Sequence, residues 1–220
     1  MLRFLMWTKR YPEFLQELHF HRSRTGQMER IFFEAALTNG INAFDTARVY
    51  MEAEHSFGNW LEKSGRREEV VILSKCGHPD AMWNKRVNEK EMRKDLKKSL
   101  EELKTDYIDI YMLHRDDPDT DVAVAVETFN AMHEEGNIGA FGASNWTHTR
   151  IEEANEYAYK HNLIPFSVSS PNFCLARQIE DPWGGGCVNI SGPENQEARA
   201  WYRKKSDAGD RVCIFGQRIF

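Results

Sequence analysis

The chain has 220 residues and a formal net charge of −5, with 29 basic and 34 acidic side chains. This balance excludes the strongly basic surface that binds nucleic acid or an anionic membrane. Hydrophobic residues make up 41% and charged residues 29% of the chain, which is typical of a globular protein and excludes a disordered one.

The cysteines and the first residues of the chain indicate the cellular compartment in which the protein is expected. The four cysteines are far apart and form no paired motif, so neither a zinc site nor a disulfide framework is predicted. The apolar start ends at Trp7, which is too short for a membrane span or a signal segment. We expect a soluble, cytoplasmic protein with no nucleic-acid or membrane partner, folded as a single domain over residues 1–220 with an atypical segment at 1–26.

From about residue 27 onward, short apolar runs alternate with amphipathic stretches. Each apolar run is typical of a strand buried on both faces, and the runs cover residues 41–45, 70–75, 108–114, 139–145 and 165–170. The stretches between them have helical periodicity, and the clearest extends from Asn88 to Lys104. Its Asn88 and Glu91 are spaced as an N-cap and its capping-box partner. The order is β-α-β-α.

Repeated βα units allow two architectures. They can close into a barrel or open into a doubly wound sheet, and the spacing of the units does not decide between them. The length of 220 residues is close to the lower limit of roughly 200 residues for an eight-stranded α/β barrel.

Polar residues stand at the ends of several expected strands: Asp45, Lys75, His114, and Ser144 with Asn145. In a parallel barrel all such ends meet at one face, where active sites are built. A Lys at the end of an apolar strand needs a partner, because an isolated buried ammonium is costly, and Asp45 is the natural one. A Lys beside a Tyr hydroxyl favours the phenolate, so Tyr50 becomes a better proton donor.

The segments GINAFDTARVY, VVILSKCG, DYIDIYMLHRDDP and IGAFGASNW together resemble the aldo-keto reductase family. The resemblance covers roughly residues 28–202 and implies an α/β fold, a (β/α)8 TIM barrel. It also implies an oxidoreductase that reduces aldehydes or ketones with hydride from NADPH. By this resemblance Asp45, Tyr50, Lys75 and His114 form the catalytic group: Tyr50 protonates the carbonyl oxygen, Lys75 held by Asp45 assists it, and His114 orients the carbonyl.

The resemblance also implies cofactor-binding residues. Ser144 and Asn145 are similar to the pair that holds the nicotinamide carboxamide, and Ser170 stands where many relatives have Gln. Phe215, in an expected seventh strand over residues 212–217, falls where the family places an aromatic ring against the nicotinamide. The barrel is expected to be incomplete: the eighth strand and the C-terminal residues that bind the cofactor's phosphates are missing, and the first strand, at Phe4–Trp7, is doubtful.

Two other functions stay open. Lys75 could act as a Schiff-base nucleophile, as in aldolases on barrel strands. Alternatively, the chain is a truncated, catalytically inactive reductase-like binding module or fragment. A Lys–Asp pair alone is more often structural. The presence of Tyr50 and His114 at the expected positions favours a catalytic role instead. Four other histidines have no partner in spacing, and we expect no role for them: His55, His78, His133 and His161.

Overall fold

The computed structural model describes residues 15–17, 26–174, 185–207 and 213–214. Strands and helices alternate along this part of the chain. The strands are β1 (Leu15–Glu17), β2 (Ala43–Asp45), β3 (Val71–Cys76), β4 (Ile108–Leu113), β5 (Ile138–Ser144), β6 (Val168–Ser170) and β7 (Cys213–Ile214). The helices are α2 (Gly26–Thr38), α3 (Ala53–Ser64), α4 (Glu89–Leu103), α5 (Val122–Glu134), α6 (His148–Lys160) and α7 (Gln196–Asp207), with short 3-10 turns at Arg67–Glu69 and Pro193–Asn195.

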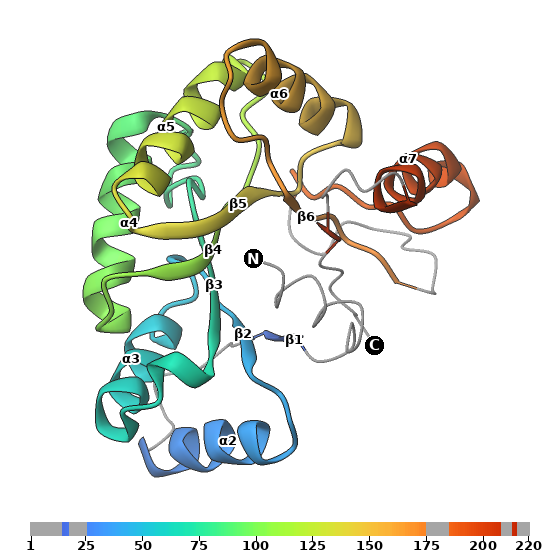
Figure 1. Cartoon of the computed structure of the whole chain (residues 1–220). Coiled ribbons are helices and arrows are strands. Elements are labelled where there is room, and N and C mark those ends of the chain that lie inside the picture. Colours follow the sequence, from blue (N-terminus) through green and yellow to red (C-terminus); the bar gives the residue numbers. More distant parts are fainter. Residues whose placement is uncertain (1–14, 18–25, 175–184, 208–212, 215–220) are drawn as a thin grey trace.

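The strands form one parallel sheet whose order follows the chain from β1 to β7. A doubly wound sheet reverses its strand order partway, whereas in a barrel each strand pairs with the next along the chain. Figure 1 shows a curled sheet with α2 to α6 in an arc along its outer side and α7 beyond β6. The fold is therefore an incomplete (β/α)8 barrel over the described residues.

Most elements expected from the sequence are confirmed. The five apolar runs form β2 to β6, and the helix expected from Asn88 to Lys104 is α4. The side-chain oxygen of Asn88 accepts a hydrogen bond from the backbone N–H of Glu91 at 3.0 Å, as the capping motif predicts. The seventh strand is present as β7, inside the expected range of 212–217.

The first strand is not where the sequence suggested. The place beside β2 is taken by Leu15–Glu17, which pairs with Ala43–Asp45. Phe4–Trp7, the segment expected there, lies outside the described residues. Within the described part of the chain, no helix combines the length and the apolar character needed to cross a membrane.

The sheet has an apolar cluster on each of its two faces. Ile72 and Tyr111 belong to the large cluster that includes the helices, whereas Leu73 and Met112 belong to a smaller cluster on the other face, inside the curled sheet. Side chains alternate between the faces of a strand. Lys75, two residues after Leu73, therefore faces the interior of the barrel.

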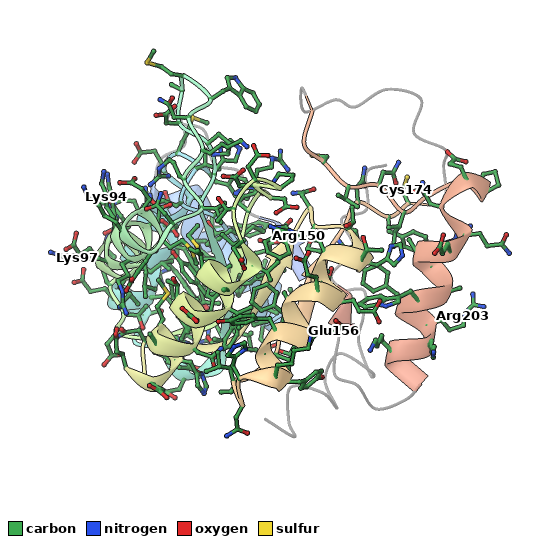
Figure 2. The ribbon with its side chains drawn as sticks, turned by 90° about the horizontal axis from the view of Figure 1, so that it is seen from above. Lys94, Lys97, Arg150, Glu156, Cys174 and Arg203 are labelled. Atoms are coloured by element: carbon green, nitrogen blue, oxygen red, sulfur yellow. The ribbon has the colours of Figure 1, made fainter. Side chains whose placement is uncertain are left out.

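The outer faces of the helices are polar, as expected for amphipathic helices around a sheet. In Figure 2, Lys94 and Lys97 point away from the body of the molecule on α4. Their side chains are 69% and 79% exposed, and each lies near a Glu three or four residues away on the same helix. These charges form a solvated face.

Candidate active site

A buried ion pair lies at the carboxyl ends of β2 and β3. Lys75 donates from Nζ to Asp45 Oδ1, and their side chains are 0% and 2% exposed. The same ammonium donates to the backbone carbonyl of Thr46 at 3.1 Å. The pair therefore satisfies the requirement that a buried ammonium be both paired and hydrogen-bonded.

Two aromatic rings lie next to this pair. The Lys75 ammonium is 5.1 Å from the ring centroid of Tyr50, within the range of a cation–π contact. The Tyr50 ring meets the His114 ring edge to face, with centroids 5.5 Å apart and planes at 81°. His114 directly follows β4 and is 6% exposed. The structure thus brings Asp45, Lys75, Tyr50 and His114 together, as the sequence predicted.

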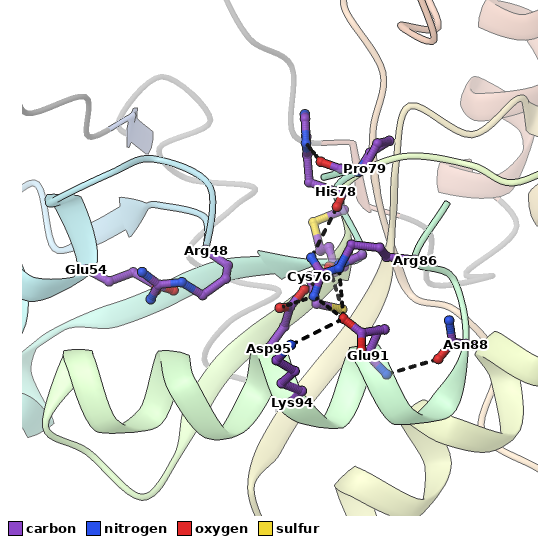
Figure 3. A network of polar contacts seen from close by, with 12 residues as sticks. Arg48, Glu54, Cys76, His78, Pro79, Arg86, Asn88, Glu91, Lys94 and Asp95 are labelled. Carbon is purple, nitrogen blue, oxygen red and sulfur yellow. Dashed lines mark hydrogen bonds and ion pairs between the residues drawn. The ribbon is translucent and has the colours of Figure 1, made fainter. Parts of the chain in front are cut away.

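The loop that carries Tyr50 is fixed on both sides. Arg48, two residues before Tyr50, forms an ion pair with Glu54 in the first turn of α3. Glu54 also accepts a hydrogen bond of 2.6 Å from the hydroxyl of Ser74, the residue beside Lys75 on β3. Figure 3 shows Arg48 and Glu54 side by side. The two flanks of Tyr50 are therefore tied to each other and to the strand that carries Lys75.

The Glu54 carboxyl is 1% exposed. Burial raises its pKa above the usual value, and the attraction of the Arg48 guanidinium opposes this change without reversing it. The Arg48 side chain is 18% exposed, so it is partly solvated and offsets only part of the cost of burying Glu54.

Ser144, Asn145 and Ser170 lie close together at the carboxyl ends of β5 and β6. The Ser144 hydroxyl donates to the backbone carbonyl of Ser170 at 3.0 Å. The side-chain amide of Asn145 donates to the His114 carbonyl at 3.0 Å and to the Ser144 hydroxyl at 3.1 Å. Asn145 has a φ of 59°, in the left-handed region where Asn is more tolerated than most residues. Its main chain therefore turns at the edge of the site.

These bonds decide which atoms are left for a ligand. Both amide hydrogens of Asn145 and the hydroxyl hydrogen of Ser144 are used within the protein, whereas no described residue bonds Asn145 Oδ1 or the Ser170 hydroxyl. An acceptor at the end of β5 and a donor at the end of β6 are thus available. A primary carboxamide needs this combination, because its NH₂ donates and its oxygen accepts. Phe215, the remaining expected cofactor contact, lies outside the described residues.

Comparison with known proteins agrees with this geometry. The model of the Aldo/keto reductase family matches residues 25–182. The chain belongs to the aldo/keto reductase family. The match includes the carboxyl ends of β2 to β6, where the polar side chains described above meet.

The relatives of this aldo/keto reductase chain are distant, and they are longer. It is 31% identical over 138 residues to an aryl-alcohol dehydrogenase of Pestalotiopsis microspora, covering 59% of this chain and 36% of that protein. It is 28% identical over 151 residues to the aldo-keto reductase YhdN of Bacillus subtilis, covering 67% and 44%. A Schizosaccharomyces pombe protein, provisionally named a voltage-gated potassium channel subunit beta, is 32% identical over 140 residues, covering 61% and 41%. The matched region is less than half the length of each relative.

One neighbour of this group in the aldo/keto reductase chain could not be placed from the sequence. His78 was expected to have no role, and in the structure its ring packs edge to face on His114, with centroids 4.9 Å apart and planes at 71°. His78 lies in the loop after β3, three residues beyond Lys75. The one signal in the sequence was that this loop directly follows Lys75, which had already been assigned to the site.

Proposed function

We propose that this chain reduces aldehydes or ketones to alcohols by hydride transfer from NADPH, with Tyr50 as the general acid. One observation carries the proposal: the buried Lys75 ammonium lies 5.1 Å from the centre of the Tyr50 ring, and that ring contacts His114 at 5.5 Å. A cation, a phenol and an imidazole thus surround one point at the mouth of the barrel.

Each of these groups has a role in a carbonyl reduction. A nearby positive charge stabilises the phenolate that forms as Tyr50 gives up its proton to the carbonyl oxygen. Asp45 pairs with the Lys75 ammonium and holds it in place inside an apolar interior. His114 is within reach to donate a hydrogen bond that orients the carbonyl. Since oriented donors act on charge that develops in the transition state, this set favours reduction at that point.

The nicotinamide end of the cofactor fits the donor and acceptor pattern beside this group. Asn145 Oδ1 would accept from the carboxamide NH₂, and the Ser170 hydroxyl would donate to the carboxamide oxygen, with Ser144 holding both residues in position. When bound, NADPH supplies the hydride. The choice of NADPH over NADH comes from the family resemblance.

Replacing Tyr50 by Phe is the direct test. Oxidation of NADPH with 4-nitrobenzaldehyde would be followed at 340 nm in the 220-residue chain, with Tyr107→Phe as the control, because Tyr107 is 37% exposed and contacts Arg67 away from the site. Loss of the general acid should lower kcat by about 10² or more, while the control should keep its rate. Equal turnover in Tyr50→Phe and wild type would refute the role of Tyr50.

The Schiff-base alternative is disfavoured by the contacts of Lys75. A nucleophilic amine needs a free lone pair, whereas this ammonium is held by a carboxylate and a carbonyl and is fully buried. Borohydride treatment with an aldehyde should leave no adduct on Lys75 by mass spectrometry. A stable adduct on Lys75 would support the aldolase-like reaction instead.

The inactive module is the other alternative. Tryptophan fluorescence would be followed during titration with NADPH and, separately, NADH. Saturable binding together with turnover supports the reductase. Cooperative thermal unfolding with no turnover would support a binding module, and the absence of a cooperative transition would support a fragment.

A further inference from the structure

The ring of His78 belongs to the same group of side chains as the proposed proton donor. His114 contacts both the Tyr50 ring and the His78 ring, at centroid distances of 5.5 and 4.9 Å. Tyr50 comes from the loop after β2 and His78 from the loop after β3, so the two rings reach His114 from neighbouring loops. His78 therefore lies at the rim of the site, next to the group that would orient the carbonyl.

The protonation state of His78 follows from its contacts. Its Nδ1 is 2.8 Å from the carbonyl oxygen of Pro79, and because a carbonyl only accepts, Nδ1 carries the hydrogen. Burial lowers the pKa of this imidazole below its usual value, so the ring is neutral near neutral pH. In a neutral ring with a protonated Nδ1, Nε2 is an acceptor. No described residue bonds this nitrogen, and it is not sealed from solvent.

The backbone of His78 is held by a network under the loop, drawn in Figure 3. Arg86 donates to the carbonyl of His78 at 3.2 Å and to Asp95 on α4 at 2.6 Å. Asp95 in turn accepts from the backbone N–H of Gly77 at 3.0 Å, and its side chain is 7% exposed. An arginine and a largely buried carboxylate thus fix the two peptide groups that set the direction of the His78 ring.

The turn at Gly77 adds to this constraint. Gly77 has a φ of +70°, which a side chain rarely adopts, and a Cβ there would lie 2.8 Å from Cδ2 of Leu113 on β4. A residue other than glycine would therefore be strained at this turn. Groups that must recognise a ligand are expected to be held in this way, by packing and by supporting hydrogen bonds.

We propose that His78 is a specificity-determining residue whose Nε2 accepts a hydrogen bond from a hydroxyl group of the substrate. This inference rests on the proposed function, because it requires the substrate carbonyl to be bound between Tyr50 and His114. Because the His78 ring packs on His114 with centroids 4.9 Å apart, a hydroxyl on the carbon next to a carbonyl held at His114 would come within reach of His78. The favoured substrates are therefore hydroxyaldehydes and hydroxyketones, and simple aldehydes lack the contact.

The test compares two substrates that differ by one hydroxyl group, lactaldehyde and propanal. Their kcat/KM values would be measured with NADPH in wild type, His78→Phe, His78→Gln and the control His55→Phe. Phe keeps a planar ring but no acceptor, whereas Gln keeps an acceptor. His55 is the matched control histidine, because it lies on α3, outside the loop of His78, and pairs with Glu102 on α4.

We expect His78→Phe to lower the preference for lactaldehyde over propanal by about fivefold, with propanal little affected, because a neutral hydrogen bond contributes roughly 1 kcal/mol. His78→Gln should retain much of the preference, and His55→Phe should keep all of it. An unchanged preference in His78→Phe, or an equal loss on both substrates, would overturn the role of His78 alone. Absence of turnover of both substrates by the wild type would instead refute the proposed function and this inference with it.

Discussion

Removing the carboxylate of the buried pair should leave a charge with no adequate partner. In Asp45→Asn, the Lys75 ammonium stays in an interior where its side chain is 0% exposed. It keeps the carbonyl of Thr46, at 3.1 Å, the face of the Tyr50 ring, and an uncharged amide in place of Asp45. We therefore expect Asp45→Asn to be one of the most destabilising single changes in this chain.

The magnitude follows from the burial of both partners. Breaking a buried ion pair by removing one member costs about 3–5 kcal/mol, because the other charge is left uncompensated. Removing both charges, in Asp45→Asn with Lys75→Met, should recover part of that loss, because no uncompensated charge is then left in the interior. The pair Lys104–Glu62, with side chains 31% and 59% exposed, is the control, and Glu62→Gln should change stability by about 0–1 kcal/mol.

Urea unfolding followed by far-UV circular dichroism gives these free energies, and equal slopes against urea concentration would show that the variants are comparable. The expected order of stability is wild type close to Glu62→Gln, then the double variant, then Asp45→Asn. If Asp45→Asn were within about 1 kcal/mol of wild type, or if the double variant were less stable than Asp45→Asn, the ion pair would not have the energetic role that its burial implies.

Three further changes test other parts of the structure. Because burial raises the pKa of Glu54 above its usual 4.5, the folded chain holds a proton that the unfolded chain releases, and this contribution to stability is lost as pH rises from 4.5 through the folded pKa. Glu54→Gln should therefore flatten the fall in unfolding free energy between pH 4.5 and neutrality, and an unchanged slope would contradict the raised pKa. Gly142→Ala would place a Cβ 1.8 Å from the Val168 carbonyl oxygen. The melting temperature should therefore fall by an amount equivalent to about 1–3 kcal/mol. A melting temperature equal to that of wild type would show that β5 and β6 are not so close. Tyr202→Phe removes a buried hydrogen bond of 2.8 Å to the Ser169 hydroxyl. The free energy of unfolding in urea should fall by about 1–3 kcal/mol. An unchanged free energy would mean that water replaces the phenol.

The strands and the polar residues at their ends could be predicted because both depend on local pattern. An apolar run such as residues 108–113 is buried on both faces wherever it lies in a parallel sheet, so its sequence is informative without knowledge of its neighbours. Parallel pairing then brings the carboxyl ends of the strands to one face, and Asp45, Lys75 and His114 are brought together with no further information. The choice of a barrel over an open sheet came from the residues, and not from the spacing.

The contacts made by loops could not be predicted in the same way. The ring contact between His78 and His114 joins residues 36 positions apart, and it depends on the path that the chain takes after Gly77. That path is set by Arg86 and Asp95, neither of which has a periodic signal that marks it as a partner. The first strand was misplaced because β1 has only three residues, and Leu15–Glu17 is not an apolar run that a sequence pattern could identify.

The loops that carry Tyr50 and His78 are anchored by the same device. Arg48 pairs with Glu54 under the first loop, and Arg86 pairs with Asp95 under the second; both arginine side chains are 18% exposed and both carboxylates are at most 7% exposed. Such pairs lose much of their Coulomb attraction to desolvation, so they add little net stability. These pairs instead restrict the orientation of the loop backbone, because a guanidinium bound to a fixed carboxylate restricts the peptide groups around it. One buried ion pair lies under the loop of Tyr50 and another under the loop of His78. Both pairs fix the geometry of these loops while adding little stability, as expected if the Tyr50 and His78 rings both contact the substrate.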